Sequence, residues 1–155
     1  MGQTNRTIAS ERPELATLLN EILGDLAFLV SDDEPPKLGP TATWLAGEIS
    51  YRGRVGGRIR AWCTLGMAEQ LSANLLGLAR NDAYAHDAAH DSLGELLNVL
   101  CGALVTAWHG ADDVFDLTMP HVRVCAEAPA LVASGPQSCA LSIQGEPLVC
   151  VHEAL

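Results

Sequence analysis

Residues 91–102 (DSLGELLNVLCG) combine an apolar helical face with a narrow polar stripe. At about 100° per residue, a helical wheel gathers four polar or small residues within roughly 60°: Asp91, Glu95, Asn98 and Gly102. The opposite side gathers four leucines: Leu93, Leu97, Leu100 and Leu104. An exposed glutamate can meet a cation, and an exposed asparagine can orient a water molecule through its amide. The spacing therefore predicts a polar site on a helix whose other face packs on a core.

The composition of this stripe differs from that of a helix face that only meets solvent. Solvated faces are rich in strong helix formers, whereas Asn98 is a poor one and Gly94 costs about 1 kcal/mol against alanine. Residues 81–122 contain no lysine or arginine. Gly102 would let another surface approach the helix closely. A simple solvated face is the alternative interpretation, and the pattern alone leaves both open.

The rest of the chain must supply the elements that position this helix. The 3.6-residue period of leucines predicts an N-terminal helix over 10–30, with Ser10 as its N-cap. Three prolines mark a loop over 31–40, and a motif-bearing α/β core follows over 41–155. The length of 155 residues is typical of one domain, so we expect a single domain over 1–155. Within the core we expect two helices and five strands: helices over 66–78 and 84–108, strands over 41–51, 57–64, 114–126, 138–144 and 147–153.

The order of these elements predicts an α+β fold, with helices packed on one face of a mainly antiparallel sheet. Glycines within 52–57 join the first two strands as a hairpin, and a tight turn at Gly145–Glu146 joins the last two. Pro120 interrupts the strand over 114–126 or confines it to an edge, because proline has no N–H to donate. Gly77 and Gly110 are expected where the two helices end.

The overall composition excludes several classes of protein. Hydrophobic residues make up 48% of the chain and charged residues 18%, which excludes intrinsic disorder. No apolar run approaches the ~18–20 residues that cross a bilayer. Nineteen acidic and nine basic residues give a net charge of −10, which disfavours nucleic acid as the partner. The N-terminal MGQTNRTIASERPE lacks the apolar region of a secretory signal.

Cysteines and arginines favour structural roles. The five cysteines include no CxxC pair, so we expect reduced, buried thiols in a cytoplasmic protein rather than a zinc site. Four arginines fall between residues 52 and 60. We interpret them as the solvent face of a strand pair, with a basic patch as the alternative.

A histidine pair offers a different chemistry. His86 and His90 stand at i and i+4, a spacing that metal ligands use on helices, and several aspartates lie nearby in the sequence. On the helical wheel both histidines lie toward the apolar side, so we expect a capping or partly buried role for them. A His86/His90 metal hydrolase is kept as an alternative. The three remaining histidines are expected to be structural: His109, His121 and His152.

The ordered combination of these motifs resembles a known family. The motif reads Asp91-x3-Glu95-x2-Asn98, with Gly102 four residues after Asn98 and Pro120 separated from Asn98 by 21 residues. It is similar to the signature of the CheC/CheX/FliY phosphatases of bacterial chemotaxis. The upstream segment YRGRVGGRIRAWCTLGMAEQLSANLLGL resembles the family's two strands and the helix after them, so the likeness covers about residues 44–125. The proline comes one residue earlier than the family pattern usually has it. A single ExxN motif favours the CheX-like branch, since CheC-type members usually carry two.

The resemblance implies a role in two-component signalling. The family hydrolyses the aspartyl phosphate of a CheY-type response regulator. By resemblance, Asn98 would position the attacking water and Glu95 would dock to the regulator's active-site lysine, while Asp91 and Gly102 would support the site. Mg²⁺ would come with the regulator, so the chain would need no metal or cofactor of its own. The resemblance also implies a homodimer formed through sheet edges.

The same resemblance leaves a second hypothesis open. The fold serves as a scaffold in flagellar switch proteins, and a fold does not determine a function. A non-catalytic module that binds a phosphorylated receiver domain is therefore the alternative to a phosphatase.

Overall fold

The computed structural model describes residues 12–36, 42–130 and 135–155. Ser10 therefore lies outside the described residues. The elements follow one another in this order: α2 (Leu15–Ala27), β1 (Trp44–Arg52), β2 (Gly56–Thr64), α3 (Leu65–Leu76), α4 (Ala83–Asp87), α5 (Ala89–His109), β3 (Asp116–Leu117), β4 (His121–Cys125), β5 (Ser138–Ile143) and β6 (Glu146–Ala154).

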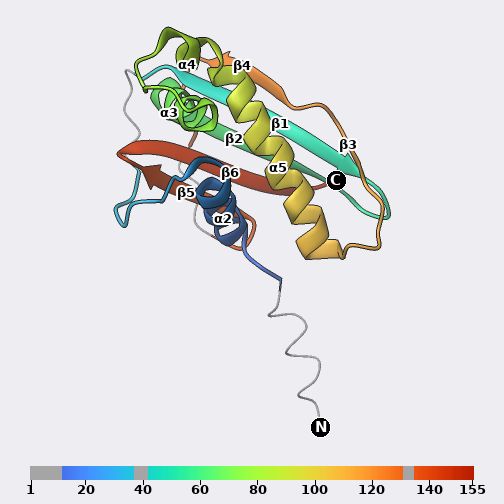
Figure 1. Ribbon diagram of the computed structural model, residues 1–155. Helices are drawn as coiled ribbons and strands as arrows, with labels where there is room; N and C mark the ends of the chain where they lie inside the picture. Colours follow the sequence, from blue (N-terminus) through green and yellow to red (C-terminus); the bar gives the residue numbers. More distant parts are fainter. Residues whose placement is uncertain (1–11, 37–41, 131–134) are drawn as a thin grey trace.

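The six strands form one sheet in the order β3-β1-β2-β6-β5, and β4 pairs with β1 on the same side as β3. Every strand pair is antiparallel. Helices α2, α3 and α5 lie together on one face of this sheet (Figure 1). The predicted α+β architecture is thus confirmed.

The core lies between these helices and the sheet. Alternate residues of β1 and β2 face the helices, because successive side chains of a strand point to opposite faces. The four leucines predicted for the inner face of α5 are fully buried: Leu93, Leu97, Leu100 and Leu104. Leu45, Ile49 and Ile59 meet them from the sheet within the same hydrophobic cluster. This burial holds the long helix in a fixed orientation.

Two helices differ from their predicted bounds. The N-terminal helix is shorter than 10–30, because Glu14 is extended at its start and Phe28 ends it in a left-handed conformation with φ 55°. The helix expected over 84–108 is two helices. Asp82 caps the first through the N–H of Tyr84, and the helix breaks at Ala88, which has φ −87° and ψ 2°. The break lets α4 contact α3 while α5 lies on the sheet.

The strand predictions need similar corrections. The expected strand over 114–126 is interrupted by residues 118–120, which leaves the two-residue β3 and the edge strand β4. Pro120 stands at this interruption, as the sequence predicted. The final hairpin turns at Gln144 and Gly145, one residue before the predicted position. Both have positive φ values, 52° and 81°, which fits a two-residue hairpin turn.

A buried polar cluster lies near the C-terminal end of α5. The Tyr51 hydroxyl and His152 Nε2 are 2.8 Å apart, and Gln137 Oε1 lies 3.2 Å from His152 Nδ1. The Trp108 indole N–H donates to the carbonyl of Pro13 at 2.8 Å. Burial lowers the pKa of His152. The structural role predicted for His152 is confirmed, since both of its ring nitrogens have partners.

Cysteines and arginines mostly occupy the expected positions. All five cysteines are free, and all but Cys125 are buried. Arg58 and Arg60 lie on β2 and form ion pairs with Glu153 of β6, which agrees with a strand-pair surface. Among the described residues, no helix combines the length and apolar character that crossing a membrane requires.

Candidate functional site

The outer face of α5 carries the three polar residues that the sequence singles out. Asp91, Glu95 and Asn98 are all exposed and occupy successive turns. Their helix cannot rotate to hide them, because its opposite face is fully buried. The predicted stripe therefore exists as a fixed surface.

The close approach of α5 to the sheet depends on a glycine in β1. A Cβ atom on Gly47 would lie 2.7 Å from Leu97 Cδ1, inside the distance that real Cβ contacts show. A larger residue would push the helix away from β1 and β4. Gly47 pairs with Val122 of β4, so the same glycine also sets the distance between α5 and the edge of the sheet.

The segment between β3 and β4 forms a second wall beside α5. Thr118 is held to β1 twice: its N–H donates to the Ser50 carbonyl at 2.9 Å, and its Oγ1 accepts from the Ser50 N–H at 3.0 Å. Pro120 lies against the helix, since a Cβ atom on Gly94 would stand 3.6 Å from Pro120 Cβ. The proline of the sequence motif thus reaches the helix that carries Glu95 and Asn98.

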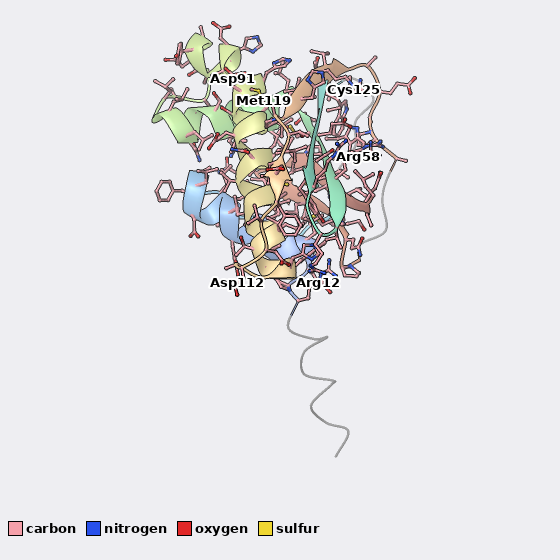
Figure 2. The ribbon with its side chains drawn as sticks, turned by 90° about the vertical axis from the view of Figure 1, so that its right-hand side faces the viewer. Arg12, Arg58, Asp91, Asp112, Met119 and Cys125 are labelled. Atoms are coloured by element: carbon pink, nitrogen blue, oxygen red, sulfur yellow. The ribbon has the colours of Figure 1, made fainter. Side chains whose placement is uncertain are left out.

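The two walls enclose an open groove of about 620 Å³. Residues from both walls line it: His90, Asp91, Gly94, Glu95, Asn98, Leu117, Thr118, Met119, Pro120, His121 and Val122. Figure 2 shows Asp91 and Met119 close together at one end of α5. The groove therefore brings the polar stripe and the motif proline into one site.

Within the described part of the chain, Asp91, Glu95 and Asn98 have no side-chain partner inside the domain. No hydrogen bond joins Glu95 or Asn98 to another described side chain, and no ion pair involves Asp91 or Glu95. The carboxylates of this wall are thus available to a positively charged partner. The Asn98 amide keeps both a donor and an acceptor free.

A thiol on the same helix is not part of this chemistry. Cys101 is buried beneath α5, and burial raises its pKa to about 12. A thiol with that pKa stays protonated near neutral pH and is a poor nucleophile.

Comparison with known proteins identifies the fold. No family model matches the sequence, and no curated protein matches it. Solved structures do match. A CheX chemotaxis protein from Desulfovibrio desulfuricans has a TM-score of 0.66 at 16% identity, over 91% of this chain and 96% of that one. CheX from Borrelia burgdorferi, solved in a CheX-CheY-BeF3-Mg²⁺ complex, has a TM-score of 0.59 at 19% identity, over 90% and 94%. FliY of Thermotoga maritima has a TM-score of 0.58 at 9% identity, over 97% and 90%.

This chain has the CheC/CheX/FliY fold. The fold implied by the sequence resemblance is therefore confirmed. Within it, the groove contains three of the four predicted site residues: Asp91, Glu95 and Asn98. Gly102 lies beyond the groove, and nothing stands within 4 Å of the position that its Cβ would take. Its supporting role stays a prediction.

Other groove residues of this CheC/CheX/FliY fold were not predicted as site residues. His90, Met119 and His121 line the groove although none belongs to the polar stripe. His121 was expected to be structural, but it is exposed at the start of β4. In the sequence, only their position next to Pro120 could have indicated that Met119 and His121 line the groove.

The histidine pair is placed differently from the prediction. Both His86 and His90 are exposed rather than partly buried. His86 lies on α4, 3.7 Å from a carboxylate oxygen of Glu69, while His90 lies on α5 and faces the groove. Across the described ranges, no group of three or more histidine, cysteine, aspartate or glutamate side chains is close enough to hold a metal ion.

Proposed function

We propose that this protein is a phosphatase that hydrolyses the aspartyl phosphate of a CheY-type response regulator. One observation carries the proposal: Glu95 and Asn98 lie exposed, without internal partners, in the groove of a chain with the CheC/CheX/FliY fold. CheY is the partner of the B. burgdorferi CheX in its complex. We extend that class of partner to this chain.

The reaction requires little covalent chemistry from the chain. Water attacks the phosphorus, the bond to the aspartyl carboxylate oxygen breaks, and aspartate and inorganic phosphate result. Phosphoryl transfer depends mainly on positioning and on stabilisation of charge. The Asn98 amide would accept a hydrogen bond from the water through its oxygen and donate one through its nitrogen. These two bonds would hold the water in line with the bond that breaks.

Glu95 would act in docking. Its carboxylate lies one turn from Asn98, and the sequence places no lysine or arginine between residues 81 and 122. A lysine of the regulator would therefore meet an uncompensated carboxylate. That contact would bring the phosphoryl group to Asn98, with Asp91 supporting the negative charge of the wall. Mg²⁺ bound by the regulator would neutralise charge on the phosphoryl group.

A dephosphorylation assay tests this function. CheY-type receivers from the same genome are phosphorylated with a small-molecule donor and Mg²⁺, and their decay is followed with this protein and its Asn98→Ala variant. We expect faster decay with the wild type and a loss of about hundredfold or more with Asn98→Ala. Thr106→Ala, an exposed change on α5 outside the groove, serves as the control and should keep full activity.

A separate measurement distinguishes the roles of the two residues. Glu95→Ala should weaken binding of the phosphorylated receiver, whereas Asn98→Ala should bind it normally. Glu21→Ala removes an exposed glutamate from α2, away from the groove, and should change neither quantity. Binding without any acceleration of decay, across every receiver tried, would replace the phosphatase by the non-catalytic binding module.

We also propose that the protein is a cytoplasmic homodimer. Free cysteines are typical of a reducing compartment. The sheet has edges at β4 and β5, and unpaired edges favour pairing with another strand. The Asp32 N–H donates to the Ser142 carbonyl at 2.7 Å, so part of the β5 edge is already occupied. Light scattering should give twice the 16.4 kDa chain mass, and a monomer mass at micromolar concentration would contradict the dimer.

A further inference from the structure

The lip of the groove opposite α5 carries an apolar side chain that the fold leaves open to solvent. Met119 is 89% exposed, although it lies between two residues that are fixed to the rest of the domain. Single exposed apolar residues are common on protein surfaces. The exposure of Met119 therefore acquires meaning only from its anchoring and its position.

The backbone on both sides of Met119 is held firmly. Before it, Thr118 exchanges two hydrogen bonds with Ser50 of β1. After it, Pro120 lies against the backbone of α5 at Gly94, and His121 begins the pairing of β4 with β1. The chain at Met119 is thus bound to the sheet and packed on the helix at once. Because the backbone around Met119 is already ordered, binding a partner to this side chain costs little conformational entropy.

Met119 faces the same groove as the residues proposed to act on the regulator. The α5 wall offers carboxylates and an amide, whereas the opposite lip offers the Met119 thioether. Met119 and Asp91 line the same groove, and Figure 2 shows both toward the N-terminal end of α5. A complementary surface would carry a cation next to an apolar side chain. Methionine suits the apolar half of such a contact, because its flexible, polarisable side chain adapts to irregular surfaces.

We propose that Met119 is the apolar docking contact for the receiver domain, and that this contact contributes to the choice among receivers. The inference rests on the proposed function, since the partner is the regulator that Glu95 and Asn98 would serve. Met119 contributes to binding and leaves the chemical step to Asn98. It is a specificity-determining residue that raises affinity by burying its side chain against the receiver.

The test compares two exposed apolar residues of nearly equal exposure. Met119→Gln keeps the length of the side chain and makes it polar, and Met119→Leu keeps its apolar character. Val114 is 84% exposed and lies outside the groove lining, so Val114→Gln is the matched control. Each variant is titrated with CheY-type receivers of the same genome activated by beryllofluoride and Mg²⁺. Turnover of the phosphorylated receivers is then measured to separate KM from kcat.

We expect Met119→Gln to raise Kd and KM about tenfold, with kcat within about twofold of the wild type. Met119→Leu should restore most of the affinity, and Val114→Gln should leave it unchanged. Affinity of Met119→Gln within about twofold of the wild type would overturn the proposal, even if Asn98→Ala abolishes turnover as the proposed function requires. A loss of kcat without a change in Kd would also overturn it. If the wild type neither binds nor dephosphorylates any receiver, the proposed function fails and the docking role of Met119 fails with it.

Discussion

Near the C-terminal end of α5, polar side chains are bonded to one another, whereas near its N-terminal end they face open solvent. Tyr51 and His152 are buried and share a hydrogen bond at the first place, and Gln137, at the surface, contacts the other ring nitrogen of His152. Asp91, Glu95 and Asn98 line an open groove at the second. Figure 2 shows the two ends, with Asp91 at one and Arg12 and Asp112 at the other. The helix α5 thus borders two kinds of polar environment, a buried hydrogen-bonded cluster and an open groove.

The difference separates structural polar groups from groups that are available to a ligand. Burying a polar atom costs free energy unless a partner satisfies it, so the Tyr51 cluster stabilises the fold only while complete. The groove residues incur no such cost, because water satisfies them until a partner arrives. Among the polar residues, stability should therefore respond to mutation of the Tyr51 cluster, and activity to mutation of the groove residues.

The largest expected effect contrasts two adjacent residues of α5. Leu97→Ala should lower the free energy of unfolding by about 2–5 kcal/mol, because the leucine is fully buried against β1. Asn98→Ala should change it by less than about 0.5 kcal/mol, since the side chain is exposed and alanine favours helix. Urea unfolding measures both. A large stability loss from Asn98→Ala would mean that Asn98 stabilises the fold, and would contradict its assignment to the groups available to a ligand.

The next effect concerns the buried hydroxyl at the other end of the helix. Tyr51→Phe would leave a ring nitrogen of His152 without its partner and should cost about 1–3 kcal/mol of unfolding free energy. Receiver dephosphorylation at a temperature well below unfolding should be unchanged. Tyr84→Phe is the control, since Tyr84 is exposed on α4. A Tyr51→Phe variant that is stable but inactive would place Tyr51 in the function instead.

Much of this organisation could be predicted from the sequence, because it is periodic. The spacing of the leucines on α5 and of the polar residues opposite them depends only on helix geometry, and both faces were predicted correctly. Pro120 and the glycine-rich hairpin have local conformational effects, so the interruption before β4 and the pairing of β1 with β2 were also predicted.

The remaining features depend on contacts between distant segments. Gly47 sets the depth of α5 on the sheet, and Ser50 holds Thr118, but neither pairing leaves a periodic signal in the sequence. The helical wheel placed His90 toward the apolar side. A helical wheel gives only the direction in which a side chain points around the helix axis, however. It does not show whether the sheet extends far enough to cover that side chain. His90 lies in the first turn of α5, beside the groove, and is exposed there.

A smaller effect should appear in the pH dependence of stability. Burial, followed by the charges of Arg12 and His109, lowers the pKa of His152 below the ordinary value of 6.5. The unfolded chain therefore takes up a proton before the folded chain does as the pH falls. Stability should be level above about pH 6.5 and should fall below it, by at most about 1.4 kcal/mol per pH unit for this proton. Urea unfolding at several pH values should show a weaker slope for His152→Gln. Equal slopes for both proteins would assign the pH dependence to other groups.

The smallest effect tests why α5 keeps two glycines within one polar face. An added Cβ meets nothing within 4 Å at Gly102, and meets Pro120 only at an ordinary 3.6 Å at Gly94. Alanine at either position should stabilise the helix by about 0.5–1 kcal/mol, as should Gly24→Ala in α2, where the space is also open. Receiver affinity should distinguish the three glycine variants. Gly94→Ala places a methyl group in the groove and should weaken docking of the receiver most. Gly102→Ala should weaken docking less, and Gly24→Ala should have no effect on it. Equal affinity in all three would mean that the groove floor does not contact the regulator, and that the docking surface lies farther out along the lip that carries Met119.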